Sequence, residues 1–143
     1  MSRRDTELDK LEVFIGKWMN HGHVVGTDEE ILTSDLYEWL PGKQFVLHTA
    51  YGQVGQRGVG GAELIGYDAE TQAFTSYLFT DGGEMRQSKL VFEGANRCTW
   101  RAKETGCTAV FTQDGTVQTA HHVRLDEHGK WVPSMEVVLR KVN

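Results

Sequence analysis

The spacing of apolar residues along the chain changes only once, close to its start. Apolar residues recur at helical spacing between Leu8 and Ile15, so they would share one face of a short amphipathic helix. Thr6 or Asp5 would cap this helix, because a short side-chain oxygen accepts from the free amides of the first turn. Gly16 would end it, because glycine adopts a left-handed conformation without penalty. The sequence thus predicts one short N-terminal helix.

Beyond Gly16 the pattern becomes alternating, with short apolar runs separated by glycine and polar turn residues. The segment 52–61 is glycine-rich and is expected to form a loop, and Asp114-Gly115 is typical of a two-residue hairpin turn. About ten strands are predicted, over residues 18–25, 30–40, 44–51, 62–67, 73–80, 84–92, 97–103, 108–113, 116–125 and 131–142.

Consecutive strands joined by tight turns, with no second helix between them, favour an antiparallel up-and-down meander. A twisted sheet of this many strands tends to curl, and closing it removes the unpaired edges. The expected fold is therefore an all-β, antiparallel up-and-down barrel of about ten strands with a short N-terminal helix. Barrels of eight strands already hold one small ligand, so we expect a cavity.

Composition narrows the class of protein further. The 143 residues suit one domain spanning 1–143, and a net charge of −5 lacks the broad basic surface of nucleic-acid-binding proteins. No apolar run is long enough to span a membrane, and no signal peptide is recognisable. With only two cysteines, the sequence predicts a cytoplasmic protein with free thiols.

Several short motifs carry a resemblance to a known family. Gly16-Lys17-Trp18 after an amphipathic helix resembles the opening of calycin barrels, in which the tryptophan fills the closed end. The order of the segments 37–42, 45–48, 65–68 and 131–137 resembles the uncharacterised, lipocalin-like bacterial family DUF1579, which implies a barrel but no reaction. A more distant resemblance to nitrobindin, through Gly16, Trp18 and Gly22, leaves haem binding as an alternative; otherwise no cofactor is predicted.

The histidines fall into two groups, those expected on the outer face of the barrel and those expected on its inner face. If Trp18 points into the barrel, His21 and His23 point outward, so no metal site is predicted from this pair. His48 lies in an apolar strand. His121 shares a face with Val123 and Leu125, so both His48 and His121 are expected inside and His122 in water.

Pockets for small molecules are mainly apolar with a few polar groups. The predicted protein is therefore a binding module for a small apolar or aromatic molecule, with an enzyme on the same barrel as the alternative. That enzyme would be an isomerase, cyclase or hydrolase that uses a pocket histidine as general acid or base. A homodimer is compatible with the sequence, but no pattern identifies its face. The cavity candidates are Trp39, His48, Tyr51, Tyr77, Trp100, Phe111 and His121.

Overall fold

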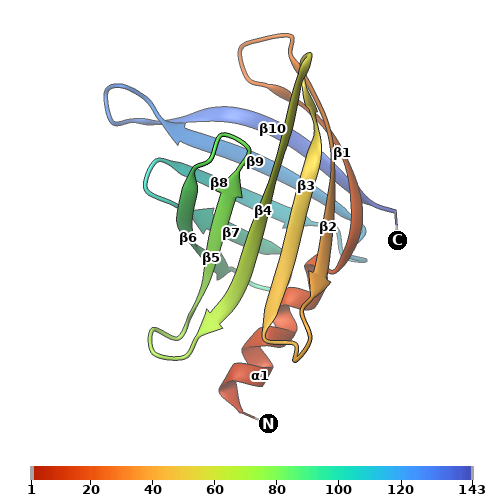
Figure 1. The fold of residues 1–143 in the computed structure, drawn as a ribbon, viewed down its shortest axis with the longest axis vertical. Coiled ribbons are helices and arrows are strands. Elements are labelled where there is room, and N and C mark those ends of the chain that lie inside the picture. Colours follow the sequence, from red (N-terminus) through yellow and green to blue (C-terminus); the bar gives the residue numbers. More distant parts are fainter. Residues whose placement is uncertain (1, 143) are drawn as a thin grey trace.

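Ten antiparallel strands form a closed barrel with the N-terminal helix at one end (Figure 1). The computed structural model describes residues 2–142. The strands are β1 (Gly16–Val24), β2 (Glu30–Trp39), β3 (Phe45–Val54), β4 (Arg57–Asp68), β5 (Ala73–Thr80), β6 (Met85–Phe92), β7 (Arg97–Arg101), β8 (Thr105–Phe111), β9 (Val117–Leu125) and β10 (Trp131–Lys141).

Each strand pairs with its neighbours in sequence, and β1 pairs with β10 to close the sheet, with Trp18 opposite Lys141. The predicted fold class, an up-and-down barrel of about ten strands, is confirmed. Closure leaves no strand of the barrel with an unpaired edge, so it needs no second sheet to cover one. Within residues 2–142, neither helical segment has the length and apolar character needed to cross a lipid bilayer.

The N-terminal helix differs from its prediction in cap and type. Ser2 is the N-cap, and its hydroxyl accepts a hydrogen bond from the backbone N–H of Asp5. The α-helix α1 (Arg3–Leu8) passes directly into a 3₁₀ helix, η1 (Asp9–Phe14). The prediction that Thr6 or Asp5 caps the helix is therefore wrong, because Ser2 also supplies a short side-chain oxygen and stands earlier in the chain.

Aromatic and aliphatic side chains fill the end of the barrel that the helix covers. Leu11, Phe14 and Trp18 are fully buried. The indole Nε1 of Trp18 donates to the carbonyl oxygen of Phe14 at 2.8 Å, which ties the first strand to the helical segment. Gly16 has φ of 129°, a value that favours glycine, so the chain can turn there between the two. This end of the barrel is a packed core rather than a cavity.

The glycine-rich segment 52–61 is not the loop that the sequence predicts. β3 continues to Val54 and β4 begins at Arg57, so most of these glycines are paired strand residues. Among these glycines, Gly55 lies in the turn between the strands, which it forms with Gln56, and it has φ of 59°. The prediction fails because glycine is common in turns but also occurs within strands, at positions where another backbone approaches closely. A Cβ on Gly61, for example, would lie 2.8 Å from the carbonyl oxygen of Phe79.

The hairpin predicted at Asp114-Gly115 is present but longer than two residues. β8 ends at Phe111 and β9 begins at Val117, so residues 112–116 form the connection. The Asp114 carboxylate accepts hydrogen bonds from Thr112 and Thr116, which shapes the loop. These contacts hold the pKa of Asp114 below its usual value, chiefly through the Thr112 hydroxyl.

Candidate functional site

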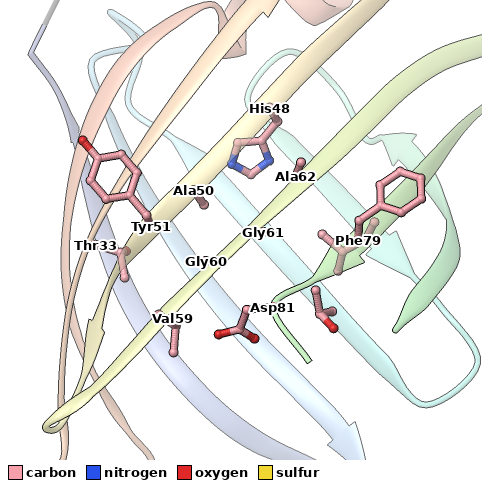
Figure 2. Close-up of a pocket in the computed structure, with 12 residues that line it drawn as sticks. Thr33, His48, Ala50, Tyr51, Val59, Gly60, Gly61, Ala62, Phe79 and Asp81 are labelled. Atoms are coloured by element: carbon pink, nitrogen blue, oxygen red, sulfur yellow. The ribbon is translucent and has the colours of Figure 1, made fainter. Parts of the chain in front are cut away.

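A cavity of about 280 Å³ lies at the β3–β4–β5 wall, where Gly60 and Gly61 contribute no side chains. In Figure 2, Tyr51 and Phe79 flank this glycine segment of β4. The cavity is lined by Thr33, His48, Ala50, Tyr51, Val59, Gly60, Gly61, Ala62, Leu78, Phe79, Thr80 and Asp81. Its surface is mostly apolar, with His48 and Asp81 among the polar groups.

His48 is held between two carboxylates from the neighbouring strands. Its Nε2 lies 2.8 Å from Oδ1 of Asp35 on β2, and its Nδ1 lies 2.8 Å from Oε1 of Glu63 on β4. All three side chains are largely buried, with exposed fractions of 15%, 9% and 10% respectively. The strand register brings these three side chains together. His48 lies directly opposite Glu63, and it is two residues from Ala50, which lies opposite Asp35.

Further contacts fix the orientation of this cluster. The Tyr37 ring stacks on the His48 imidazole with centroids 3.9 Å apart and an interplanar angle of 7°. The Asn20 amide Nδ2 donates to Oδ2 of Asp35 at 2.7 Å and to the Thr33 hydroxyl at 2.9 Å. Each oxygen of Asp35 therefore has a donor, and the imidazole has little freedom to rotate.

The two carboxylates decide the charge of His48. Burial by itself lowers the pKa of His48, but the hydrogen bonds to Asp35 and Glu63, reinforced by their charges, raise it to about 9. The imidazole is therefore protonated at neutral pH and donates from both nitrogens. Two carboxylates and one imidazolium give the Asp35–His48–Glu63 cluster a net charge of −1.

This raised pKa predicts a loss of stability as the pH rises. A histidine whose pKa is 6.5 when unfolded and about 9 when folded stabilises the protein fully below pH 6.5, and the contribution disappears through pH 9. We expect the free energy of unfolding to fall by about 2 kcal/mol between pH 7.0 and 8.5, from one extra bound proton in the folded state. Urea denaturation at both pH values measures the difference.

The control for this measurement is His48→Gln, which cannot titrate and should show a much flatter dependence over the same interval. His122 has a pKa lowered by burial, so its contribution changes below pH 6.5 and not in this window. An equal pH dependence in wild type and His48→Gln would contradict a charged His48.

Some buried polar atoms near the barrel axis have no protein partner. Oδ1 of Asn20, Nε1 of Trp100 and Nε2 of Gln118 are buried and form no hydrogen bond to the described residues. The second oxygen of Glu63, Oε2, also accepts none from residues 2–142, but it is not one of these fully buried atoms. Unpaired buried polar atoms are costly, so these atoms are suited to bind polar groups of a ligand or water.

The cysteines also face the interior, on neighbouring strands. Sγ of Cys107 lies 3.7 Å from Nε2 of His122. Burial raises the pKa of the Cys107 thiol to about 12 and lowers the pKa of His122. Both groups are therefore neutral at physiological pH, and the thiol is not an activated nucleophile. Cys98 is fully buried, and both cysteines are free, as expected.

The prediction that His121 faces the interior is wrong. His122 points inward and His121 points outward, where its side chain is 52% exposed and pairs with Glu136. The error comes from treating the apolar face of β9 as the inner one. Inside the barrel, this strand carries the buried Gln118 and Ala120, so the polar side is the inner side.

The aromatic candidates occupy three different environments. Tyr77 is on the outer face and 51% exposed; Tyr51, 64% exposed, is also outward but borders the cavity. Trp39 packs beside the helical segment, with its indole donating to Glu12 at 2.8 Å. Phe111 belongs to the packed end, against Phe14. Of the seven candidates, His48 and Tyr51 line the cavity. Trp100 faces the interior but does not line the cavity.

Sequence reasoning missed the two carboxylates. Asp35 shares the inner face of β2 with Ile31 and Tyr37, and Glu63 shares that of β4 with Ile65. A charged residue on the apolar face of an alternating strand was the available signal, because such residues are rarely buried without a partner.

The His21 and His23 pair on β1 shows no metal-ligand geometry. The His21 side chain is 68% exposed on the outer wall, as predicted, and contacts Glu30. Among residues 2–142, no group of three His, Cys, Asp or Glu side chains is arranged to hold a metal ion.

Comparison with known proteins supports the class of fold. No family model matches the sequence, and no curated protein matches it. A de novo designed fluorescence-activating β-barrel superposes with a TM-score of 0.50 and 13% identity, over 93% of this chain and 97% of that one. The S-type phycobiliprotein lyase CPES from Guillardia theta superposes with a TM-score of 0.55 and 10% identity, over 100% and 99%. At these identities the likeness defines a closed antiparallel β-barrel and no particular activity.

Proposed function

We propose that this protein binds a small molecule with an apolar or aromatic body and a hydrogen-bond donor or amine group. The observation that carries the proposal is the buried Asp35–His48–Glu63 cluster beside an apolar cavity. The cavity wall supplies apolar contact, from residues such as Leu78 and Val59. Removing apolar surface from water is worth about 25 cal/mol per Å² before the costs of association.

The charge of the site supports a donor or a cation over an anion. The cluster carries a net charge of −1, Asp81 adds a carboxylate to the cavity lining, and no Lys or Arg among the described residues lines it. Oδ1 of Asn20 and Oε2 of Glu63, in the barrel interior but outside the cavity lining, accept no hydrogen bond from residues 2–142. An ammonium or amide N–H would satisfy such acceptors, whereas a carboxylate would be repelled.

A pair of probes with the same aromatic body tests the proposal. We expect 1-naphthylmethylamine to bind at least about tenfold more tightly than 1-naphthoic acid, since hydrogen bonds to charged groups are worth about 1.5–3 kcal/mol. Isothermal titration calorimetry at pH 7.0 measures both dissociation constants.

Two variants locate the binding site. Glu63→Gln removes one negative charge with little change of shape, so the preference for the amine should fall toward one. Glu127→Gln makes the same change at a side chain that is 88% exposed, and it should leave the preference unchanged. Equal binding of the two probes, or no binding of either, would overturn the proposal.

One observation favours the enzyme alternative, namely a histidine of shifted pKa that is hydrogen-bonded to carboxylates inside the barrel. However, a general base needs a free nitrogen within reach of the substrate, and both nitrogens of His48 are occupied. Binding is therefore the function that this geometry supports better.

The remaining parts of the proposal rest on the sequence. Membership of the lipocalin-like DUF1579 family, a bacterial origin and a cytoplasmic location are proposed from the motifs and composition. For the haem alternative, His122 is an inward-facing neutral imidazole that could ligate iron. A hemin titration in which the Soret band neither shifts nor sharpens relative to free hemin would exclude haem.

A further inference from the structure

The outer wall formed by β3, β4 and β5 is unusually poor in charge. Residues on a strand alternate between the two faces, and His48 and Glu63 define the inner one. The outward positions from Phe45 to Tyr51, from Gly60 to Gly66 and from Thr75 to Phe79 include no Asp, Glu, Lys or Arg. In a chain with a net charge of −5 and 24% charged residues, a wall three strands wide without a charge is informative.

Large apolar side chains stand exposed on this wall and at its margins. Met85 on β6 lies opposite Phe79, and Leu36 on β2 lies opposite Thr49, so both continue the wall across the register. The exposed fractions are 47% for Phe45, 64% for Tyr51, 51% for Tyr77, 41% for Phe79, 79% for Met85 and 40% for Leu36.

The exposed apolar area fits the needs of a stable dimer. With about 200 Å² for each large side chain, these fractions amount to roughly 600 Å² of apolar surface. A standard interface buries about 800 Å² on each partner, and about 65% of a homodimer interface is apolar. The wall thus provides about the apolar area that one side of a homodimer interface contains.

We propose that the β3–β4–β5 wall is the interface of a homodimer, with the same wall of a second copy as its partner. An isologous interface places each residue near its own symmetry mate or that of a neighbour. Two acidic chains repel each other over most of their surfaces, but the outward positions of β3, β4 and β5 bring no charge into contact, and the exposed Glu38 on β2 and Lys89 on β6 lie at the margins of the wall. Tyr51 and Phe79 also border the cavity, so the partner would cover the cavity's outer margin.

The proposal does not depend on the function assigned to the cavity. Sedimentation velocity of the full chain across a range of concentrations should give a species of twice 16.1 kDa. Tyr77→Glu places two carboxylates at a symmetric interface, and we expect the dimer dissociation constant to rise at least about 30-fold. Met85→Glu, at a side chain that is 79% exposed and tolerant of change, should act in the same direction.

Thr119→Glu is the matched control, because it adds the same charge to an exposed position on β9. This variant should remain dimeric, and far-UV circular dichroism should show all variants folded. A wild-type protein that is monomeric throughout the concentration range would overturn the proposal. So would a dimer that survives both Tyr77→Glu and Met85→Glu, since its interface would then lie elsewhere.

Discussion

Replacing Asp35 by alanine should destabilise the protein by about 3–5 kcal/mol, because it leaves the buried His48 imidazolium with one of its two carboxylates. The change also removes the acceptor of the Asn20 amide, which then keeps only the Thr33 hydroxyl. Urea denaturation at pH 7.0 measures the loss. Asp35→Asn keeps the shape and one acceptor oxygen, so a smaller loss is expected.

A double-mutant cycle separates the charge interaction from the packing of the two side chains. If the cluster is coupled, Asp35→Ala combined with His48→Ala should cost clearly less than the sum of the single changes, since Asp35 and His48 are removed together and only Glu63 is left without its partner. Additive losses would mean that Asp35 and His48 stabilise the barrel independently of each other.

Replacing Phe14 by alanine should cost about 3–5 kcal/mol, the range for large aromatic truncations in a packed core. Phe14 is fully buried, and its ring lies 5.3–6.0 Å from the rings of Tyr37, Phe92, Trp100 and Phe111. It connects the helical segment to strands on several sides of the barrel. The free energy of unfolding in urea is again the measurement.

The conservative change Phe14→Leu keeps most of the volume and should cost less than half as much. A small loss for both Phe14 variants would mean that the helical segment contributes little to the closed end. Both variants keep the hydrogen bond from the Trp18 indole to Phe14, because its acceptor is the backbone carbonyl oxygen of residue 14.

The fold could be predicted from the sequence to a large extent because each strand pairs with the next. Alternation identifies strands such as β5, whose bounds Ala73–Thr80 agree with the prediction. Because consecutive strands pair, the main feature left to predict is whether the first and last strands also pair and close the barrel. The glycines of 52–61 misled the prediction, because their role depends on close approach of other strands and not on local conformation.

The site was less predictable, because its inner face mixes polar and apolar residues. The rule that apolar residues point inward holds at the packed end and correctly places Trp18. It fails for β9, where Gln118 and His122 are inside and His121 is outside. His48 could be recognised by its apolar neighbours, but the meeting of His48 with Asp35 and Glu63 depends on the register of three strands. A single sequence does not fix that register.

The seam between β1 and β10 has a consequence for the order of folding. All other pairings join consecutive strands, so their hairpins need only short loops to close, and such local contacts form quickly. The seam joins the two most distant strands and waits until both have formed. During synthesis, β1 therefore keeps an open backbone edge until residues 131–141 leave the ribosome. Slow emergence of β10 would prolong exposure of that edge to pairing with other nascent chains.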